Sequence, residues 1–412
     1  MLLSGAETGW GSMSTQVGVG QRVAEMRKLM GWSQPRLARE AHISVSLVRA
    51  VEQGRAPASS AFVSSCARAL KVSPAELLGQ PYPRTTTEQS DVAAGIAVIR
   101  VELAAHDLPA AGVKPRPFAA IAADVAQIRK HRRETNFYRL SSDLPALLTE
   151  VRALVHSTQG REREKGFLLL CELYTSSRSL AHKLGYTDLA TLAVERMTWA
   201  ASLSGSRLWM ACAQFHRASV LTSAGDWNTA LAYLEQCRHD LESAIDGADL
   251  ESLISWGTLH LQSGLGAARS GDRDAADTHL AEARSVAARV GSADFHDPVM
   301  NFGRANTDIW AVGLAVEMLD GTEAIKRAEN LILPANTPKS RAGHLYIDLA
   351  RGFLLHGDRA KTLDALNTAR KIAPTQTRYH PMVHETVRVL ARQEARSTES
   401  LRGFVAWCGV GQ

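Results

Sequence analysis

The chain has 412 residues, of which 45% are hydrophobic, 6% aromatic and 22% charged, with a net charge of +5. This length is enough for a sizeable core and two domains, and the composition excludes a wholly disordered chain. No apolar run approaches the ~20 residues that span a bilayer, and residues 1–18 lack the blocks of a secretory signal. The five cysteines are widely spaced without a C-x-x-C pair, so we expect a cytoplasmic protein with reduced thiols.

Residues 1–18 show no helical periodicity, and we expect a disordered N-terminal extension there.

Residues 33–54 predict two short helices joined by a tight turn. Ser33 and Ser44 are typical N-cap residues, and Pro35 lies in a first turn, where a missing N–H costs least. Gly54 ends the second helix. The apolar positions at helical spacing are Leu37, Ala38, Ala41, Val48 and Val51.

The flanking residues extend this pattern to five helices. Further helices are predicted over 19–30, 61–70 and 73–78. The motif resembles the XRE helix-turn-helix family, the fold of phage Cro and repressor DNA-binding domains. The resemblance implies a DNA-binding domain over 19–79 and an internal pair between Arg27 and Glu52. It departs from the family at His42, where glycine is usual. The matching residues are Ser33-Gln34, Leu37-Ala38, Ala41, Ile43-Ser44, Val48, Val51-Glu52 and Gly54.

Charge is concentrated in this segment. Residues 19–80 contain nine Lys and Arg against four Glu, so this segment alone accounts for the net +5 of the chain. A phosphate backbone attracts such a surface. In a helix-turn-helix, the second helix presents its outward residues to base edges. The predicted DNA-contacting residues are Gln34, Ser44, Val45, Ser46, Arg49, Ala50, Gln53 and Arg55.

These residues have different expected roles. Arg49 has the geometry for a bidentate bond to guanine, Ser46 for a base or phosphate, and Val45 for a thymine methyl group. Gln34 resembles the family glutamine that touches phosphate. Gln53 and Arg55 lie where the following loop meets the DNA backbone. Because amide side chains are few on this face, we expect DNA shape to contribute to specificity.

Residues 80–90 are rich in proline and threonine and predict a linker, followed by a helical connector over 91–158. The basic run 129–133 is expected to be a solvated helix face, with DNA contact as the less favoured alternative. From residue 159 to 412 we expect a helical sensor and dimerisation domain. Its turns recur with a glycine, an aspartate or threonine, and then alanine, around Gly185, Gly225, Gly271, Gly321 and Gly357.

The spacing of these glycines, 36 to 50 residues, is near the ~34-residue period of tetratricopeptide repeats. This region therefore resembles a degenerate tetratricopeptide-like solenoid. The whole chain is similar to actinobacterial regulators with an XRE head and such a body. It is more distantly similar to Gram-positive quorum-sensing regulators that bind a peptide pheromone. The resemblance implies a peptide or small-molecule effector. Because one small head makes few base contacts, we expect a homodimer that binds an inverted-repeat DNA operator.

Aromatic and amide side chains in the body are candidates for an effector site. The alternative is ordinary packing for the tryptophans and a loop network for the polar residues. The candidate ligand-binding residues are Trp209, His216, Trp256, His260, Asn301, Arg304 and Asn306. The segment 400–412, with Phe404, Val405 and Trp407, is expected either to cap the repeat array or to form the dimer interface.

The sequence offers little for catalysis. It contains no Walker P-loop, no H-E-x-x-H and no G-x-S-x-G motif, and its histidines lack ligand spacing. We therefore expect no enzyme activity, no cofactor and no metal. The sequence predicts an all-α, ligand-responsive transcriptional regulator that binds double-stranded DNA and no membrane. The alternative is a protein-interaction scaffold with a vestigial DNA-binding head.

Overall fold

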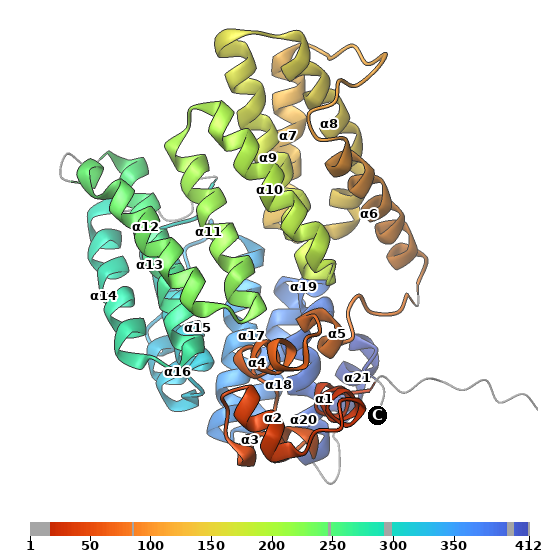
Figure 1. Ribbon diagram of the computed structural model, residues 1–412, viewed down its shortest axis with the longest axis vertical. Helices are drawn as coiled ribbons and strands as arrows, with labels where there is room; N and C mark the ends of the chain where they lie inside the picture. Colours follow the sequence, from red (N-terminus) through yellow and green to blue (C-terminus); the bar gives the residue numbers. More distant parts are fainter. Residues whose placement is uncertain (1–16, 85, 246–248, 292–298, 394–398, 411–412) are drawn as a thin grey trace, which may run out of the picture.

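A computed structural model describes residues 17–84, 86–245, 249–291, 299–393 and 399–410 (Figure 1). All regular secondary structure in these residues is helical, which confirms the expected all-α class. Most of the expected N-terminal extension, residues 1–16, lies outside the described residues. We call residues 19–79 the head and residues 160–408 the body.

The head contains the five expected helices. Ser33, Ser44, Ser59 and Ser73 each cap a helix, because their hydroxyl groups accept a backbone N–H three residues further on. A small core of buried side chains, including Val23, joins the helices. The helices are α1 (Val19–Leu29), α2 (Gln34–Glu40), α3 (Val45–Glu52), α4 (Ser60–Leu70) and α5 (Pro74–Leu78).

Three helices connect the head to the body: α6 (Thr87–Ala105), α7 (Phe118–Arg133) and α8 (Phe137–Ser157). Helix α6 begins inside the stretch expected to be a linker. The cause is a capping box, in which Thr86 and Gln89 each bond the other's backbone N–H. Before this helix, Tyr82 lies against the body, where its ring stacks on His384 at 4.2 Å between ring centroids.

The body is a run of antiparallel helix pairs. Its helices are α9 (Gly160–Leu184), α10 (Thr187–Ser204), α11 (Arg207–Ala224), α12 (Trp227–Ile245), α13 (Leu250–Ser270), α14 (Arg273–Val290), α15 (Arg304–Glu317), α16 (Gly321–Ala328), α17 (Lys339–His356), α18 (Arg359–Ile372), α19 (Pro374–Tyr379), α20 (Pro381–Gln393) and α21 (Glu399–Cys408). Most adjacent members pack along their length, and one continuous core extends from α6 to α15.

The turns within the pairs follow the predicted chemistry. Asp226, Asp272, Asp320 and Asp358 each accept a backbone N–H in the first turn of the next helix. Left-handed glycines precede three of them. At the fourth turn the left-handed residue is Leu319, with φ of 59°, and Gly321 begins α16 instead. A side chain at Gly321 would overlap the backbone of α17, so close packing requires this glycine.

Figure 1 shows the body as a curved array, with the head against its lower end. Helix α4 contacts α11 and α13, while α2 and α3 lie at the free end of the head. At the C-terminus, Phe404 and Val405 of α21 are buried in the core shared with α17, α18 and α20. The ring of Trp407 lies 4.5 Å from the guanidinium of Arg370. These contacts favour the capping role that we expected as one alternative for this segment.

Candidate nucleic-acid interface

Helix α3 has one face in the core of the head and one in solvent. Val48 and Val51 are buried, whereas Ser46 and Arg49 are exposed and Val45 is half-buried. The Ser44 hydroxyl accepts the N–H of Leu47 at 3.1 Å and lies 3.0 Å from the Ser46 hydroxyl. Ala50 is half-buried beside them. The helix therefore presents a small polar and apolar surface with a single long cation, Arg49.

A buried ion pair fixes the position of α3. The Arg27 guanidinium donates to both carboxylate oxygens of Glu52, from Nε to Oε1 at 2.7 Å and from the terminal nitrogen to Oε2 at 2.9 Å. This confirms the pair that the resemblance implied. The side-chain amide of Gln34 also donates to Glu52, at 2.7 Å. The structure thus turns the amide nitrogen of Gln34 into the head, whereas we expected this residue to touch phosphate.

The turn before α3 and the loop after it border the same face. His42 adopts a left-handed conformation, with φ of 55°, at the position where the related family usually has glycine. Gln53 and Arg55 are exposed and hydrogen-bonded to each other at 2.8 Å. Gly54, between them, is buried beneath the guanidinium of Arg392 from α20. A residue of the body therefore borders the loop that we expect to meet the DNA backbone.

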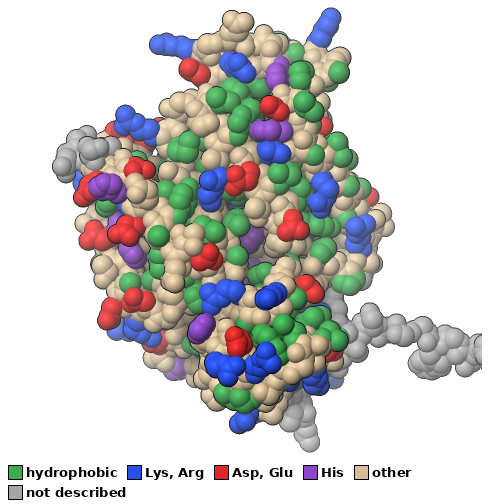
Figure 2. Space-filling view, in the orientation of Figure 1, with side chains coloured by type: hydrophobic (Ala, Val, Ile, Leu, Met, Phe, Trp, Pro, Cys, Tyr) green, Lys and Arg blue, Asp and Glu red, His purple; other side chains and the backbone are tan. Residues whose placement is uncertain are grey.

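The exposed end of the head is rich in positive charge. Figure 2 shows several Lys and Arg side chains over the end that carries α2 and α3. Arg36 and Arg39 of α2 are exposed there and are not among the DNA-contacting residues that we expected from the sequence. Their position in the sequence could have identified them. Both follow the predicted N-cap at Ser33, on the helix that crosses the DNA backbone in this motif.

The opposite side of the head is attached to the body through α4. Ser64 donates to the carbonyl of Ser223 at 2.8 Å, and Ser60 donates to Glu317 at 3.3 Å. Arg68 donates to the carbonyl of Gly225 at 3.0 Å and lies 5.7 Å from the ring centroid of Trp227. The outward face of α3 is therefore on another side of the head than α4, and the body reaches the expected DNA-contacting region only at the loop around Gly54.

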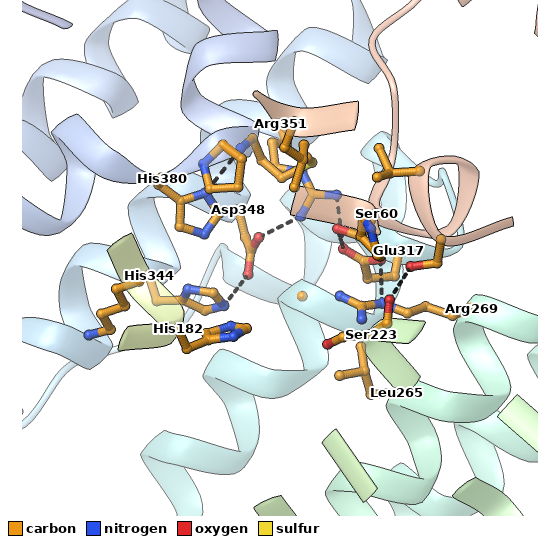
Figure 3. Close-up of a pocket in the computed structure, with 18 of the residues that line it drawn as sticks. Ser60, His182, Ser223, Leu265, Arg269, Glu317, His344, Asp348, Arg351 and His380 are labelled. Atoms are coloured by element: carbon orange, nitrogen blue, oxygen red, sulfur yellow. Dashed lines mark hydrogen bonds and ion pairs between the residues drawn. The ribbon is translucent and has the colours of Figure 1, made fainter. Parts of the chain in front are cut away.

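A cavity of about 300 Å³ lies between α4, α5 and the body. Glu317, which is 5% exposed, accepts hydrogen bonds from Arg269 and Arg351, both at 2.9 Å, and from Ser60 of the head (Figure 3). Burial would raise the pKa of Glu317, but the two guanidiniums outweigh it and lower that pKa to about 2. Asp348 lies 3.0 Å from Arg351 and 3.4 Å from His344.

The candidate ligand residues of the body are dispersed, and none lines this cavity. Trp209 and His216 are buried in α11, Trp256 is partly buried against the core, and Arg304 is exposed on α15. His260 is buried, and its Nδ1 lies 3.1 Å from Nδ1 of His279. Burial, followed by the charge of Arg238, lowers the pKa of His260 to about 3.

The two amide candidates are held by arginines. Asn301 accepts a hydrogen bond from Arg133 at 2.8 Å. Asn306 accepts from Nε of Arg341 at 2.7 Å, and Arg341 is a lining residue of the cavity. Asn306 therefore contacts a residue that lines the cavity but does not line it itself. The other candidates are distributed along the helical array.

The basic run 129–133 is not the solvated face that we expected. Arg129 and Arg132 both pair with Glu172 of α9, at 3.3 and 2.8 Å, and that carboxylate side chain is 3% exposed. Only Lys130 of the run is exposed. The expectation was wrong because α7 packs against α9, which buries a carboxylate that needs these cations.

Among the described residues, no cluster of three or more His, Cys, Asp or Glu side chains is arranged to hold a metal ion. No described helix combines the length and apolar character needed to cross a membrane.

Comparison with known protein families identifies a helix-turn-helix domain over residues 19–78. These bounds cover all five helices of the head, for which we expected residues 19–79. Neither the comparison with curated proteins nor that with solved structures found a match. Residues 19–78 therefore form a helix-turn-helix domain, which is the part of the chain that supports binding to DNA.

Proposed function

We propose that this protein is a sequence-specific regulator of transcription, which binds double-stranded DNA through α2 and α3 and responds to an effector bound by its body. One observation carries the proposal: the outward face of α3 is exposed while the opposite side of the head is held by the body. A recognition helix needs this exposure to enter a major groove.

The roles of the side chains follow from their chemistry. Arg49 bonds a guanine through its two guanidinium nitrogens, Ser46 a base edge or phosphate, and Val45 a thymine methyl group. Ser44, Ala50, Gln53 and Arg55 border this contact and position the head on the backbone. The second N–H of the Gln34 amide, which Glu52 does not use, donates to a phosphate oxygen. Because one head makes few base contacts, two chains bind together as a homodimer on an inverted repeat about one DNA turn apart.

The test begins with selection of bound duplexes from a random pool by the full chain. Fluorescence anisotropy then compares the selected duplex with a scrambled one at two salt concentrations. Arg49→Ala is expected to lose roughly 10- to 100-fold affinity for the selected duplex and little for the scrambled one. Arg55→Ala is expected to weaken both and to reduce the salt slope by about 0.9. Arg161→Ala, an exposed arginine of α9, is the control.

Each outcome separates the alternatives. Equal losses for Arg49→Ala and Arg55→Ala on both duplexes would refute the division of roles. Failure to select any duplex, with equal salt-sensitive binding to all, would favour the scaffold with a vestigial head. Sedimentation velocity tests the dimer, and a monomer that binds a single half-site tightly would exclude it.

A further inference from the structure

The cavity between head and body contains more positive than negative charge. Four cationic side chains line it, Lys183, Arg269, Arg341 and Arg351, against the two carboxylates of Glu317 and Asp348. Both carboxylates are already engaged, Glu317 by two arginines and Asp348 by Arg351 and His344. Among the described residues, Lys183 and Arg341 take part in no ion pair.

Their hydrogen-bond partners are neutral amides. Lys183 donates to Oε1 of Gln376 at 2.6 Å, and Arg341 donates to Oδ1 of Asn306 at 2.7 Å. Burial, together with the positive charges of Arg132, Arg178 and Arg341, lowers the pKa of Lys183 to about 7. Both side chains are half-buried. A half-buried cation without a carboxylate partner is costly, and a bound anion is the direct way to offset that cost.

One part of the remaining lining is apolar. Leu265 of α13, Ile309 and Leu314 of α15 and Val63 of the head contribute aliphatic side chains. The guanidinium of Arg341 lies 5.8 Å from the ring centroid of Trp310, so the cationic and apolar parts of the lining adjoin. Figure 3 shows His182 and His344 on one side of the cavity and Leu265 on the other.

We infer that this cavity binds a small organic anion, a carboxylate or phosphate carried on an apolar body, with the charged group between Lys183 and Arg341 and the apolar part against α13, α15 and α4. The volume, about 300 Å³, lies at the lower end of the range for small-molecule sites, about 300–1,000 Å³. Because α4 and α5 form one wall, the bound anion contacts the back of the DNA-binding head. Only the regulatory use of this ligand rests on the proposed function.

The test is a binding titration of the full chain, without DNA, with two fluorescent probes. 1-Anilinonaphthalene-8-sulfonate is an apolar molecule with one anionic group, and N-phenyl-1-naphthylamine is its counterpart without the sulfonate. We expect one anionic probe to bind per chain, at least about tenfold more tightly than the neutral one, as a charged hydrogen bond predicts. Octanoate and octyl phosphate are then compared as competitors that displace the anionic probe. The one that displaces it at the lower concentration shows whether the cavity prefers a carboxylate or a phosphate.

Substitutions locate the site. Lys183→Met and Arg341→Met are each expected to weaken the anionic probe about tenfold or more and to leave the neutral probe unchanged. Lys183→Arg, which keeps the charge, should retain binding. The matched controls are Lys165→Met, exposed on the same helix as Lys183, and Arg304→Met, an exposed arginine that the sequence analysis selected. Thermal melting shows whether each variant is folded.

Several results would overturn the inference. These are equal affinity for the two probes, absence of anionic binding, or unchanged binding in folded Lys183→Met and Arg341→Met variants. Loss of binding in Arg304→Met would move the site to the candidates chosen from the sequence. Since the titration contains no DNA, its failure is distinct from a failure of the duplex selection, and either proposal can stand without the other.

Discussion

Glu317 offers the sharpest test of the contact between head and body, because three partners from three helices bond one buried carboxylate. Arg269 comes from α13, Arg351 from α17 and Ser60 from the head. The substitution Glu317→Gln keeps the shape of the side chain and removes its charge. Two largely buried guanidiniums then lose a negative partner, although Arg351 keeps Asp348.

The loss of stability expected for Glu317→Gln follows both from the pKa of Glu317 and from the typical cost of breaking a buried ion pair. The pKa of Glu317 falls from the ordinary 4.5 to about 2, and at about 1.4 kcal/mol for each tenfold change in proton affinity this corresponds to ~3 kcal/mol of stability. Removal of one partner from a buried ion pair typically costs about 3–5 kcal/mol. We therefore expect Glu317→Gln to lose about 3 kcal/mol at pH 7.

The pH dependence separates charge from shape. A carboxyl whose pKa is lowered on folding stabilises the protein above its unfolded pKa, and this stabilisation is lost as pH falls from 4.5 towards 2. Urea unfolding, followed by circular dichroism, measures the free energy of unfolding. The difference in this free energy between wild type and Glu317→Gln should become smaller as pH falls below 4.5. Glu329→Gln, an exposed residue of the neighbouring turn, is the control. A difference within about 0.5 kcal/mol at pH 7, or one unchanged at pH 3, would refute this reasoning.

Two further predictions concern single residues. His42→Gly should raise the melting temperature of the full chain, followed by circular dichroism. The reason is that a left-handed non-glycine residue costs about 1–2 kcal/mol, whereas glycine costs about 0.5–1 kcal/mol in chain entropy. A lower melting temperature would show instead that the imidazole makes a stabilising contact. For Lys183, the pKa of about 7 in the folded protein against the ordinary 10.5 means that the unfolded chain binds more protons between these values. Wild-type stability should therefore rise by up to about 1.4 kcal/mol per pH unit above pH 7, and Lys183→Met should lack this increase in urea unfolding at pH 7 and 9. Identical pH dependence in the two proteins would contradict the assignment.

The features that were predicted correctly have local causes. A serine at Ser33 or Ser44 caps a helix through its own hydroxyl and a backbone N–H three residues away, so a short stretch of sequence contains both partners. The aspartates that open α14 and α18 behave in the same way. The five helices of the head and the all-α class followed from such signals together with apolar periodicity.

The features that were missed depend on residues far apart in the chain. Lys183, Glu317 and Arg341 meet at the cavity although they lie on α9, α15 and α17, and no local pattern connects them. The basic run at Arg129 and Arg132 was misjudged for the same reason, because its partner Glu172 belongs to another helix. The orientation of Gln34 likewise depends on Glu52, which is distant in sequence.

The burial of α4 on two sides limits how far the head can be treated as a portable module. Phe62 and Cys66 belong to the core of the head, while Ser64 and Arg68 bond the body, so neighbouring positions of one helix serve two different interfaces. A head excised near Gln80 would expose Val63 and Leu78, which now line the cavity. A chimaera that joins this head to another body must therefore redesign α4 and α5 as well as the linker.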